Sequence, residues 1–238
     1  MVGIDVGGTF TDFVSYDPET KKIEVWKNPS TPSDPNDGIL TGLKKFETPG
    51  DIKNLRLGTT IATNAILERK GATVGYVTTK GFRDIPFIQR GNRRSHYDIT
   101  WIKPKPLVKR RHCYEISERV MANGEVETPL DEAGVRAMAK QIKEEGEIEA
   151  LAVNFLFSYV RPDHEQRVKE ILAEELPDIP VSISFDGMPK WKEYERASTT
   201  IADAYIKPIV SNQVRNLRQR FTENGITDHI VVIKSNGG

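Results

Sequence analysis

Ile4-Asp5-Val6-Gly7-Gly8-Thr9-Phe10-Thr11-Asp12 is the most informative stretch of this 238-residue sequence. Its first aspartate ends an apolar strand, its two glycines form a tight turn, and hydroxyl residues open the next strand. Because glycine has no β-carbon, a phosphate group can approach the backbone N–H groups of the turn directly. A P-loop would need GxxxxGK[ST] and a Rossmann loop would open a helix, so the stretch fits neither. We predict a hairpin that binds phosphate.

Each polar residue of this hairpin has a predicted role. Asp5 is expected to hold Mg²⁺ through water, because this ion prefers oxygen ligands and keeps much of its hydration. Thr9 and Thr11 can add hydroxyl donors, and Thr11 and Asp12 are expected to support the loop. The predicted site consists of Asp5 and Thr9 as catalytic residues, Asp5 as the metal ligand, and Gly7, Gly8, Thr9, Thr11 and Asp12 as nucleotide-binding residues. An ordinary hairpin turn is the competing interpretation, since GG pairs are common turn formers.

A second polar group follows the strand predicted at 55–59. Gly58 and Thr59 end that strand, and the helix expected from about residue 60 to 70 carries Asn64. We predict Thr59, Thr60 and Asn64 as further nucleotide-binding residues, because their hydroxyl and amide groups can hold substrate or the terminal phosphate. The alternative is a threonine cap followed by a polar helix surface.

Apolar patterning predicts the other elements. Residues 2–6, 11–16 and 22–26 are expected to form three strands of a β-meander. Helices then alternate with strands, which is typical of an α/β sheet with a mixed edge and helices on both faces. The expected helices span 36–46, 60–70, 128–146, 162–176 and 190–221, and the expected later strands span 55–59, 72–78, 150–157, 181–185 and 230–234. From about 81 to 127 the pattern loses its period, which predicts an irregular insert of loops and a hairpin.

The composition narrows the function classes. Lys plus Arg and Asp plus Glu each number 34, so neither nucleic acid nor anionic lipid is an expected main partner. No apolar run approaches the roughly 20 residues that a membrane span needs. The single cysteine, Cys113, excludes an internal disulfide and is expected to be a structural thiol. We expect a cytoplasmic protein, also because no basic-then-apolar leader opens the sequence.

Other polar residues are weaker candidates. Arginines of the irregular segment can grip a carboxylate or phosphate, yet solvated loop arginines are the ordinary case. Its aspartates can be catalytic acids, but isolated loop aspartates are commonly caps. The histidines near the cysteine lack the spacing of a zinc site. These candidates are Arg90, Asn92, Arg93, Arg94, Asp84, Asp98, His96, His112 and Cys113.

The segment DVGGTFTD resembles the first phosphate loop of the actin-like ATPase and sugar-kinase superfamily. More narrowly, the sequence is similar to the hydantoinase A/5-oxoprolinase family, which also includes ATP-dependent acetone and acetophenone carboxylase subunits. The supporting segments are 57–65, 80–84, 90–93, 118–120, 128–131, 193–200 and 235–238, so the resemblance extends over nearly the whole chain.

This resemblance implies a fold and a division into domains. Residues 1–186 would form a ribonuclease-H-like domain with the insert at about 81–127, and residues 187–238 the connecting helix and first strand of an incomplete second lobe. Family members bind ATP with Mg²⁺ between two lobes, and their second phosphate loop lies beyond this sequence. A C-terminal lobe or a separate chain would supply that loop, so this chain alone is expected to be a poor ATPase.

The resemblance also implies an activity. ATP would phosphorylate a carbonyl oxygen of a cyclic amide of the hydantoin or 5-oxoproline type, and a partner domain or subunit would hydrolyse the activated amide. The alternatives are a ketone carboxylase subunit, a small-molecule kinase of the sugar-kinase type, and a non-catalytic scaffold lobe. Segments 90–93 and 193–200 do not belong to the sugar-kinase pattern.

Overall fold

The computed structural model describes residues 1–31, 34–46, 52, 54–91, 97–226 and 229–233. The chain divides into two compact units, which we call unit 1 (Met1–Leu67 with Ile209–Gly238) and unit 2 (Glu68–Pro208). Helix α7 (Glu193–Glu223) contributes its first half to unit 2 and its second half to unit 1. The predicted domain boundary between residues 186 and 187 does not coincide with the limits of these units. It refers to the domains of the family and stays a prediction.

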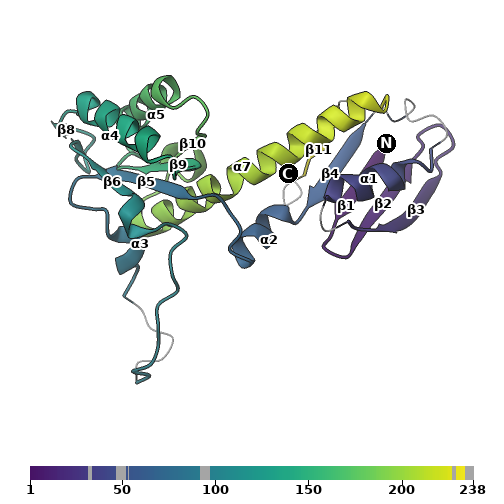
Figure 1. Cartoon of the computed structure of the whole chain (residues 1–238), viewed down its shortest axis with the longest axis horizontal. Coiled ribbons are helices and arrows are strands. Elements are labelled where there is room, and N and C mark those ends of the chain that lie inside the picture. Colours follow the sequence, from purple (N-terminus) through teal and green to yellow (C-terminus); the bar gives the residue numbers. More distant parts are fainter. Residues whose placement is uncertain (32–33, 47–51, 53, 92–96, 227–228, 234–238) are drawn as a thin grey trace. The chain divides into compact units, whose positions relative to one another are not determined.

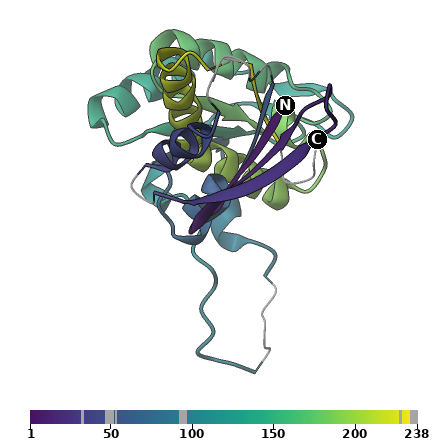
Figure 2. The same ribbon diagram turned by 90° about the vertical axis from the view of Figure 1, so that its right-hand side faces the viewer.

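Unit 1 contains a five-stranded sheet in the order β11-β4-β1-β2-β3. Its strands are β1 (Val2–Val6), β2 (Phe10–Tyr16), β3 (Ile23–Pro29), β4 (Leu55–Thr59) and β11 (Ile230–Val232). The first three form an antiparallel meander and run side by side in Figures 1 and 2. Strand β4 pairs with β1, and β11 with β4, in parallel. The predicted β-meander at the edge of a mixed sheet is confirmed.

One face of this sheet carries the hydrophobic core of unit 1. In β1, Val2, Ile4 and Val6 are buried while Asp5 is exposed, because successive side chains of a strand point to opposite faces. Helix α1 (Pro35–Leu43) and the second half of α7 contribute to the same apolar cluster. Asp5 therefore projects from the face opposite to this core.

Unit 2 contains a four-stranded parallel sheet in the order β10-β9-β5-β6. Its strands are β5 (Val74–Thr79), β6 (Cys113–Ile116), β9 (Ala150–Asn154) and β10 (Val181–Ile183). All residues of β5 and β9 are buried, as expected for central strands that are covered on both faces. Helices α4 (Glu132–Glu145) and α5 (Asp163–Glu175) share an apolar cluster with this sheet, and α7 bonds to it through Asn154 and Ser182.

The α/β class is confirmed, and the strands after β4 are divided among three sheets: β11 joins the sheet of unit 1, four strands form the sheet of unit 2, and two strands form a separate hairpin. The segment predicted as an irregular insert contributes more structure than expected: α3 (Ile85–Ile88), a 3-10 turn (Arg110–His112), β6, and the hairpin of β7 (Arg119–Val120) and β8 (Val126–Thr128). The remaining short helices are α2 (Ile61–Leu67) and α6 (Ser184–Gly187). Within the ranges given above, no helix combines the length and the apolar character that a membrane crossing requires.

Candidate phosphate-binding site

The turn between β1 and β2 consists of Gly7, Gly8 and Thr9. Gly7 N donates a hydrogen bond to Phe10 O (3.1 Å), which closes the hairpin. Ser30, which follows β3, donates twice to the turn, from its N to Thr9 O (2.9 Å) and from its Oγ to Gly7 O (2.8 Å). Two carbonyl groups of the turn are therefore fixed by the residue that follows β3.

The N–H groups of Gly8 and Thr9 have no acceptor among the described residues. Both residues are exposed, and a β-carbon on Gly8 would meet no atom within 4 Å. Successive unpaired N–H groups in a turn can bind an anion. The amides that are free for phosphate are thus those of Gly8 and Thr9, because the N–H of Gly7 is used inside the hairpin.

Two carboxylates lie on the strands that flank this turn. Asp5 on β1 pairs in register with Asp12 on β2, so both side chains project from the same face of the sheet. On its other side Asp5 pairs with Gly58 of β4, whose missing β-carbon leaves room for the carboxylate. Both aspartates are exposed, and among the described residues neither carboxylate has a hydrogen-bond or ion-pair partner.

These carboxylates fit a hydrated divalent cation. Like charges directly opposite each other on paired strands are unfavourable, and a cation between them removes that cost. Mg²⁺ prefers oxygen ligands and keeps several waters. In the described part of the chain, no group of three or more His, Cys, Asp or Glu side chains is placed to hold a metal. The residues present therefore suit an ion that is held largely through water.

Thr11 is buried, and its Oγ1 lies 3.0 Å from Ser30 Oγ. Ser30 also binds the carbonyl groups of Gly7 and Thr9. Thr11 therefore stabilises the turn indirectly, through its contact with Ser30. This position suits the supporting role predicted for Thr11 better than direct contact with a nucleotide.

The second predicted group lies beside the end of β1. Thr60 donates from its N and its Oγ1 to Val6 O (3.4 and 3.3 Å), and Asn64 Nδ2 donates to Thr60 Oγ1 (3.4 Å). Thr59 Oγ1 accepts from Ile61 N (3.3 Å), which is a capping bond at the beginning of α2. The structure places this group next to the strand that leads into the Gly7-Gly8 turn, and its contact with nucleotide stays a prediction.

Three charged candidates of the irregular segment, Arg90, Asp84 and Asp98, already have partners. Arg90 makes two hydrogen bonds to Glu195 (2.9 and 2.5 Å), and Arg110 makes two to Asp84 (2.7 and 2.9 Å). The bonds from Arg110 lower the pKa of Asp84. Asp98 accepts hydrogen bonds within its own turn. These contacts favour the structural interpretation. Candidates Asn92, Arg93, Arg94 and His96 lie outside the described residues, as does segment 235–238.

Arg196 is a key residue of unit 2 whose role the sequence did not reveal. Its side chain is buried, and its guanidinium donates to Asn154 Oδ1 (2.8 Å) and Phe155 O (2.5 Å) at the carboxyl end of β9. Burial lowers the pKa of Arg196. Ligands of parallel sheets commonly bind outside the carboxyl ends of the strands, and here an arginine side chain occupies that position at β9. The one available signal was a charged residue within the helical segment that carries the apolar Ala197 and Ile201.

Cys113 and His112 do not form a metal site with any other described residues. Burial raises the pKa of Cys113 to about 12, and its Sγ donates to Lys109 O (3.5 Å). His112 is buried, and its Nε2 lies 3.1 Å from Glu147 Oε2. The geometry agrees with a structural thiol.

Two family models match this chain, and the first of them includes the turn and its flanking strands. Residues 1–176 match the hydantoinase/oxoprolinase N-terminal region, and residues 196–238 match hydantoinase/oxoprolinase. The chain belongs to the hydantoinase/oxoprolinase family. The resemblance inferred from DVGGTFTD is confirmed.

Relatives within the hydantoinase/oxoprolinase family are longer than this chain. It is 39% identical to an uncharacterised protein of Methanocaldococcus jannaschii, over 100% of this chain and 35% of that protein. It is 34% identical to the caprolactamase subunit alpha of Pseudomonas jessenii and 33% identical to the acetophenone carboxylase gamma subunit of Aromatoleum aromaticum, again over 100% of this chain and 35% of each protein. The chain thus spans about a third of the length of these relatives.

A solved structure of a related protein has the same fold. The ATP-dependent caprolactamase from Pseudomonas jessenii matches with a TM-score of 0.88 at 33% identity, over 100% of this chain and 36% of that chain. The fold is therefore that of the family's N-terminal region.

Proposed function

We propose that this chain is the N-terminal nucleotide-binding part of an ATP-dependent enzyme that activates a carbonyl group by phosphorylation. The supporting observation is the pair of free N–H groups of Gly8 and Thr9 beside the facing carboxylates of Asp5 and Asp12. Donors for phosphate oxygens and oxygen ligands for Mg²⁺ are what enzymes of phosphoryl transfer need.

The residues of the chain have distinct parts in this proposal. ATP would supply the phosphoryl group, and Mg²⁺ would offset the charge on its oxygens. The N–H groups of Gly8 and Thr9 bind phosphate oxygens, and the exposed Thr9 hydroxyl is a third donor. Asp5 and Asp12 hold the waters of the metal ion through their free oxygens. Gly7 keeps the hairpin closed, so that these groups stay in fixed positions.

The cap of α2 forms the second wall of the proposed site. Thr60 and Asn64 are linked to the end of β1 through Val6 O, and Thr60 is exposed. Its one proton is used at Val6 O, so the Thr60 hydroxyl keeps a lone pair that can accept a hydrogen bond from a donor group of the substrate, at little entropic cost. We include Thr59, Thr60 and Asn64 in the site on this basis.

The substrate class is argued from the relatives. The caprolactamase relative acts on a cyclic amide, which favours a cyclic amide of the hydantoin or 5-oxoproline type here. An amide carbonyl is a poor electrophile, and phosphorylation of its oxygen prepares it for hydrolysis. The acetophenone carboxylase relative supports a second candidate, a ketone carboxylase subunit. A C-terminal lobe or separate chain, together with a hydrolase or carboxylase subunit, would complete the cytoplasmic enzyme in either case.

ATP turnover in the completed enzyme tests this function. The chain is assayed alone and together with the remaining lobe and the partner subunit, with Mg²⁺, a cyclic amide, or a ketone plus bicarbonate. We expect weak nucleotide binding and negligible turnover alone, and amide-stimulated ATP hydrolysis in the assembly. Stimulation by ketone plus bicarbonate selects the carboxylase. An assembly that neither binds nor hydrolyses ATP would show that this lobe is a scaffold.

A further inference from the structure

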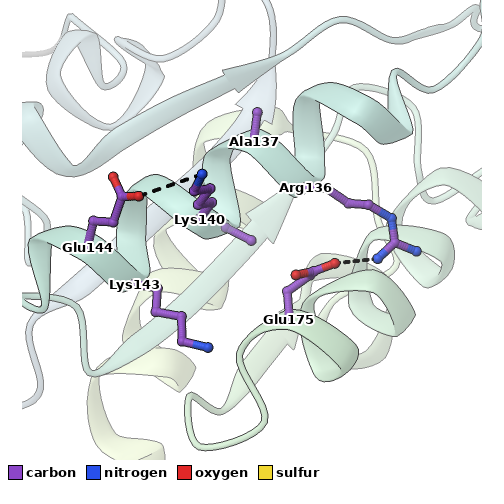
Figure 3. A pocket seen from close by; sticks show the side chains of 7 residues that line it. Arg136, Ala137, Lys140, Lys143, Glu144 and Glu175 are labelled. Carbon is purple, nitrogen blue, oxygen red and sulfur yellow. Dashed lines mark hydrogen bonds and ion pairs between the residues drawn. The ribbon is translucent and has the colours of Figure 1, made fainter.

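Two cavities of unit 2 are lined by basic side chains, and they differ in charge balance. The first, of about 550 Å³, lies along α4 and contains carboxylates beside its cations. Figure 3 shows Arg136 paired with Glu175 (2.5 Å) and Lys140 facing Glu144 (4.0 Å). Most of the positive charge of this first cavity is therefore neutralised by the protein itself.

The second cavity, of about 330 Å³, lies at the beginning of β5. It is lined by residues from segments 69–74 and 106–112 and by Tyr205. Arg69 and Lys109 are among them, whereas no Asp or Glu is among the described residues that line it. Lys109 Nζ has no partner among the described residues. A volume of this size is in the range of sites for small molecules.

The backbone of segment 106–112 adds unpaired donors to this second cavity. The N–H groups of Leu107, Val108 and Lys109 have no acceptor among the described residues, although Val108 is only 4% exposed. Val108 is the buried member of the three, whereas Leu107 is half-buried and Lys109 is exposed. A buried N–H group without a partner is rare, because its lost hydration is not replaced. The ring atom Nδ1 of His112, which also lines the cavity, is likewise buried and unpaired in the described chain. The three backbone N–H groups would be satisfied by a ligand that brings acceptor atoms. The same holds for His112 Nδ1 in the tautomer in which it carries the proton and Nε2 accepts from Arg111 Nε (3.0 Å).

Arg69 shows that the wall of the second cavity is held in an unfavourable backbone conformation. Its φ angle is 54°, in the left-handed region that residues other than glycine rarely adopt. Its guanidinium donates to Lys105 O (2.8 Å) and Pro106 O (3.5 Å), which ties segment 69–74 to segment 106–112. Strained residues of this kind cluster at ligand sites, where surrounding contacts maintain them.

Gly71 allows the ring of Tyr205, the third part of the cavity wall, to pack against segment 69–74. A β-carbon on Gly71 would lie only 2.0 Å from the ring of Tyr205, so the ring packs directly on the glycine. Tyr205 O also accepts from Ala72 N (2.9 Å). The ring of Tyr205 thus forms an apolar wall of the cavity. Segment 106–112, which carries Lys109, forms a charged wall.

We propose that the second cavity binds a small organic or inorganic oxyanion, a ligand with a phosphate or carboxylate group. Lys109 supplies the charge, and the N–H groups of Leu107, Val108 and Lys109 supply hydrogen bonds to the oxygens. Hydrogen bonds to an ionised group are stronger than those between neutral groups. This site is separate from the turn at Gly8, which belongs to unit 1.

Amide chemical shifts of the 238-residue chain test the proposal. The probes are inorganic phosphate and succinate, each titrated at constant ionic strength. We expect saturable shifts at Leu107, Val108 and Lys109 with at least one probe. The probe that binds more tightly identifies the preferred group. Lys109→Ala should weaken binding about 10-fold, since charge-assisted bonds contribute that much, and should leave the melting temperature unchanged because its side chain is exposed and unpaired.

Two controls separate this site from others. Lys143→Ala, in the first cavity, should leave the shifts and affinity unchanged. Gly8→Ala should affect phosphate-induced shifts at the turn of unit 1 and not those at segment 106–112. Absence of saturable shifts with both probes overturns the proposal, as does binding that is insensitive to Lys109→Ala. Because these measurements need neither ATP nor turnover, their outcome is independent of the function proposed for the turn.

Discussion

The carboxylate of Asp5 lies over Gly58 of the neighbouring parallel strand, so closely that a β-carbon on Gly58 would be 3.1 Å from Asp5 Oδ1. This distance is shorter than most contacts of a β-carbon, so the carboxylate would have to shift slightly. The absence of a side chain at Gly58 therefore leaves the space that the proposed metal-binding oxygen of Asp5 occupies.

Gly58→Ala should displace Asp5 without unfolding unit 1. In a strand, alanine costs less conformational entropy than glycine, so the melting temperature should stay equal or rise slightly. We expect Mg²⁺-dependent ATP hydrolysis of the assembled enzyme to fall about 10-fold, because the metal ligand is shifted. Unchanged Mg²⁺ dependence would show that the position of Asp5 does not matter for the reaction.

Asp5→Asn should retain the fold and lose most of the ATP-dependent activity. The two side chains are nearly isosteric, and Asp5 has no hydrogen-bond partner to lose among the described residues. Removal of the charge weakens the hold on Mg²⁺, for which we expect a loss on the order of 10²-fold in rate. Thermal unfolding and Mg²⁺-dependent ATP hydrolysis are the two measurements, and full activity of the variant would exclude Asp5 as the metal anchor.

Asp17→Asn, at the next hairpin, is the matched control. Asp17 accepts hydrogen bonds from Thr20 Oγ1 (2.6 Å) and Glu19 N (3.0 Å), and these bonds lower its pKa. Asparagine keeps one acceptor oxygen, so activity should be unchanged and the melting temperature should fall slightly. The carboxylate of Asp17 therefore stabilises its own turn and lies outside the proposed site.

Gly7 and Gly8 should respond differently to alanine. A β-carbon on Gly7 would lie 2.9 Å from Phe10 O, a backbone atom, so Gly7→Ala should open the hairpin and lower the melting temperature. On Gly8 it would meet nothing within 4 Å, so Gly8→Ala should fold normally. It would nevertheless fill the space where phosphate approaches, and nucleotide affinity measured by calorimetry should drop. Normal affinity in Gly8→Ala would argue for an ordinary turn.

Arg196→Met should destabilise unit 2 strongly. The substitution leaves Asn154 Oδ1 without its buried donor, and an unsatisfied buried group costs about 1–3 kcal/mol. It also removes one of the two donors to Phe155 O, the other being Ser158 Oγ (3.1 Å). We expect a loss of about 3 kcal/mol in the free energy of unfolding in urea. Arg167→Met, which breaks exposed ion pairs to Glu132 and Glu170, should leave the free energy of unfolding nearly unchanged. Equal losses would contradict the buried role of Arg196.

Cys113 should react slowly with a disulfide reagent at pH 8. Burial raises its pKa to about 12, so the reactive thiolate is scarce until the pH approaches that value. The rate should rise with pH and should increase sharply when urea unfolds the chain. Rapid reaction of the folded protein at pH 8 would show that the thiol is accessible and activated.

Local chemistry made several features predictable from the sequence. The Gly7-Gly8 turn, the meander and the buried strand near 150 are encoded by residues within a few positions of each other, through turn propensity and side-chain periodicity. The irregular region illustrates the limit of this signal. Strand β6 (Cys113–Ile116) is four residues long and follows a basic run, so no period is visible there.

Contacts between distant residues were decided only by the tertiary structure. The residues near Gly58, Arg196 and β5 in the sequence do not predict their partners. Gly58 lies opposite Asp5, Arg196 reaches the end of β9, and β5 belongs to a different sheet from β4. Strand register and the burial of a charged side chain depend on which surfaces meet after the chain has folded back over tens of residues. The sequence therefore determined the Gly7-Gly8 turn and the family. The arrangement of chain segments around Asp5 determined which backbone amides and carboxylates of this region lack a partner among the described residues.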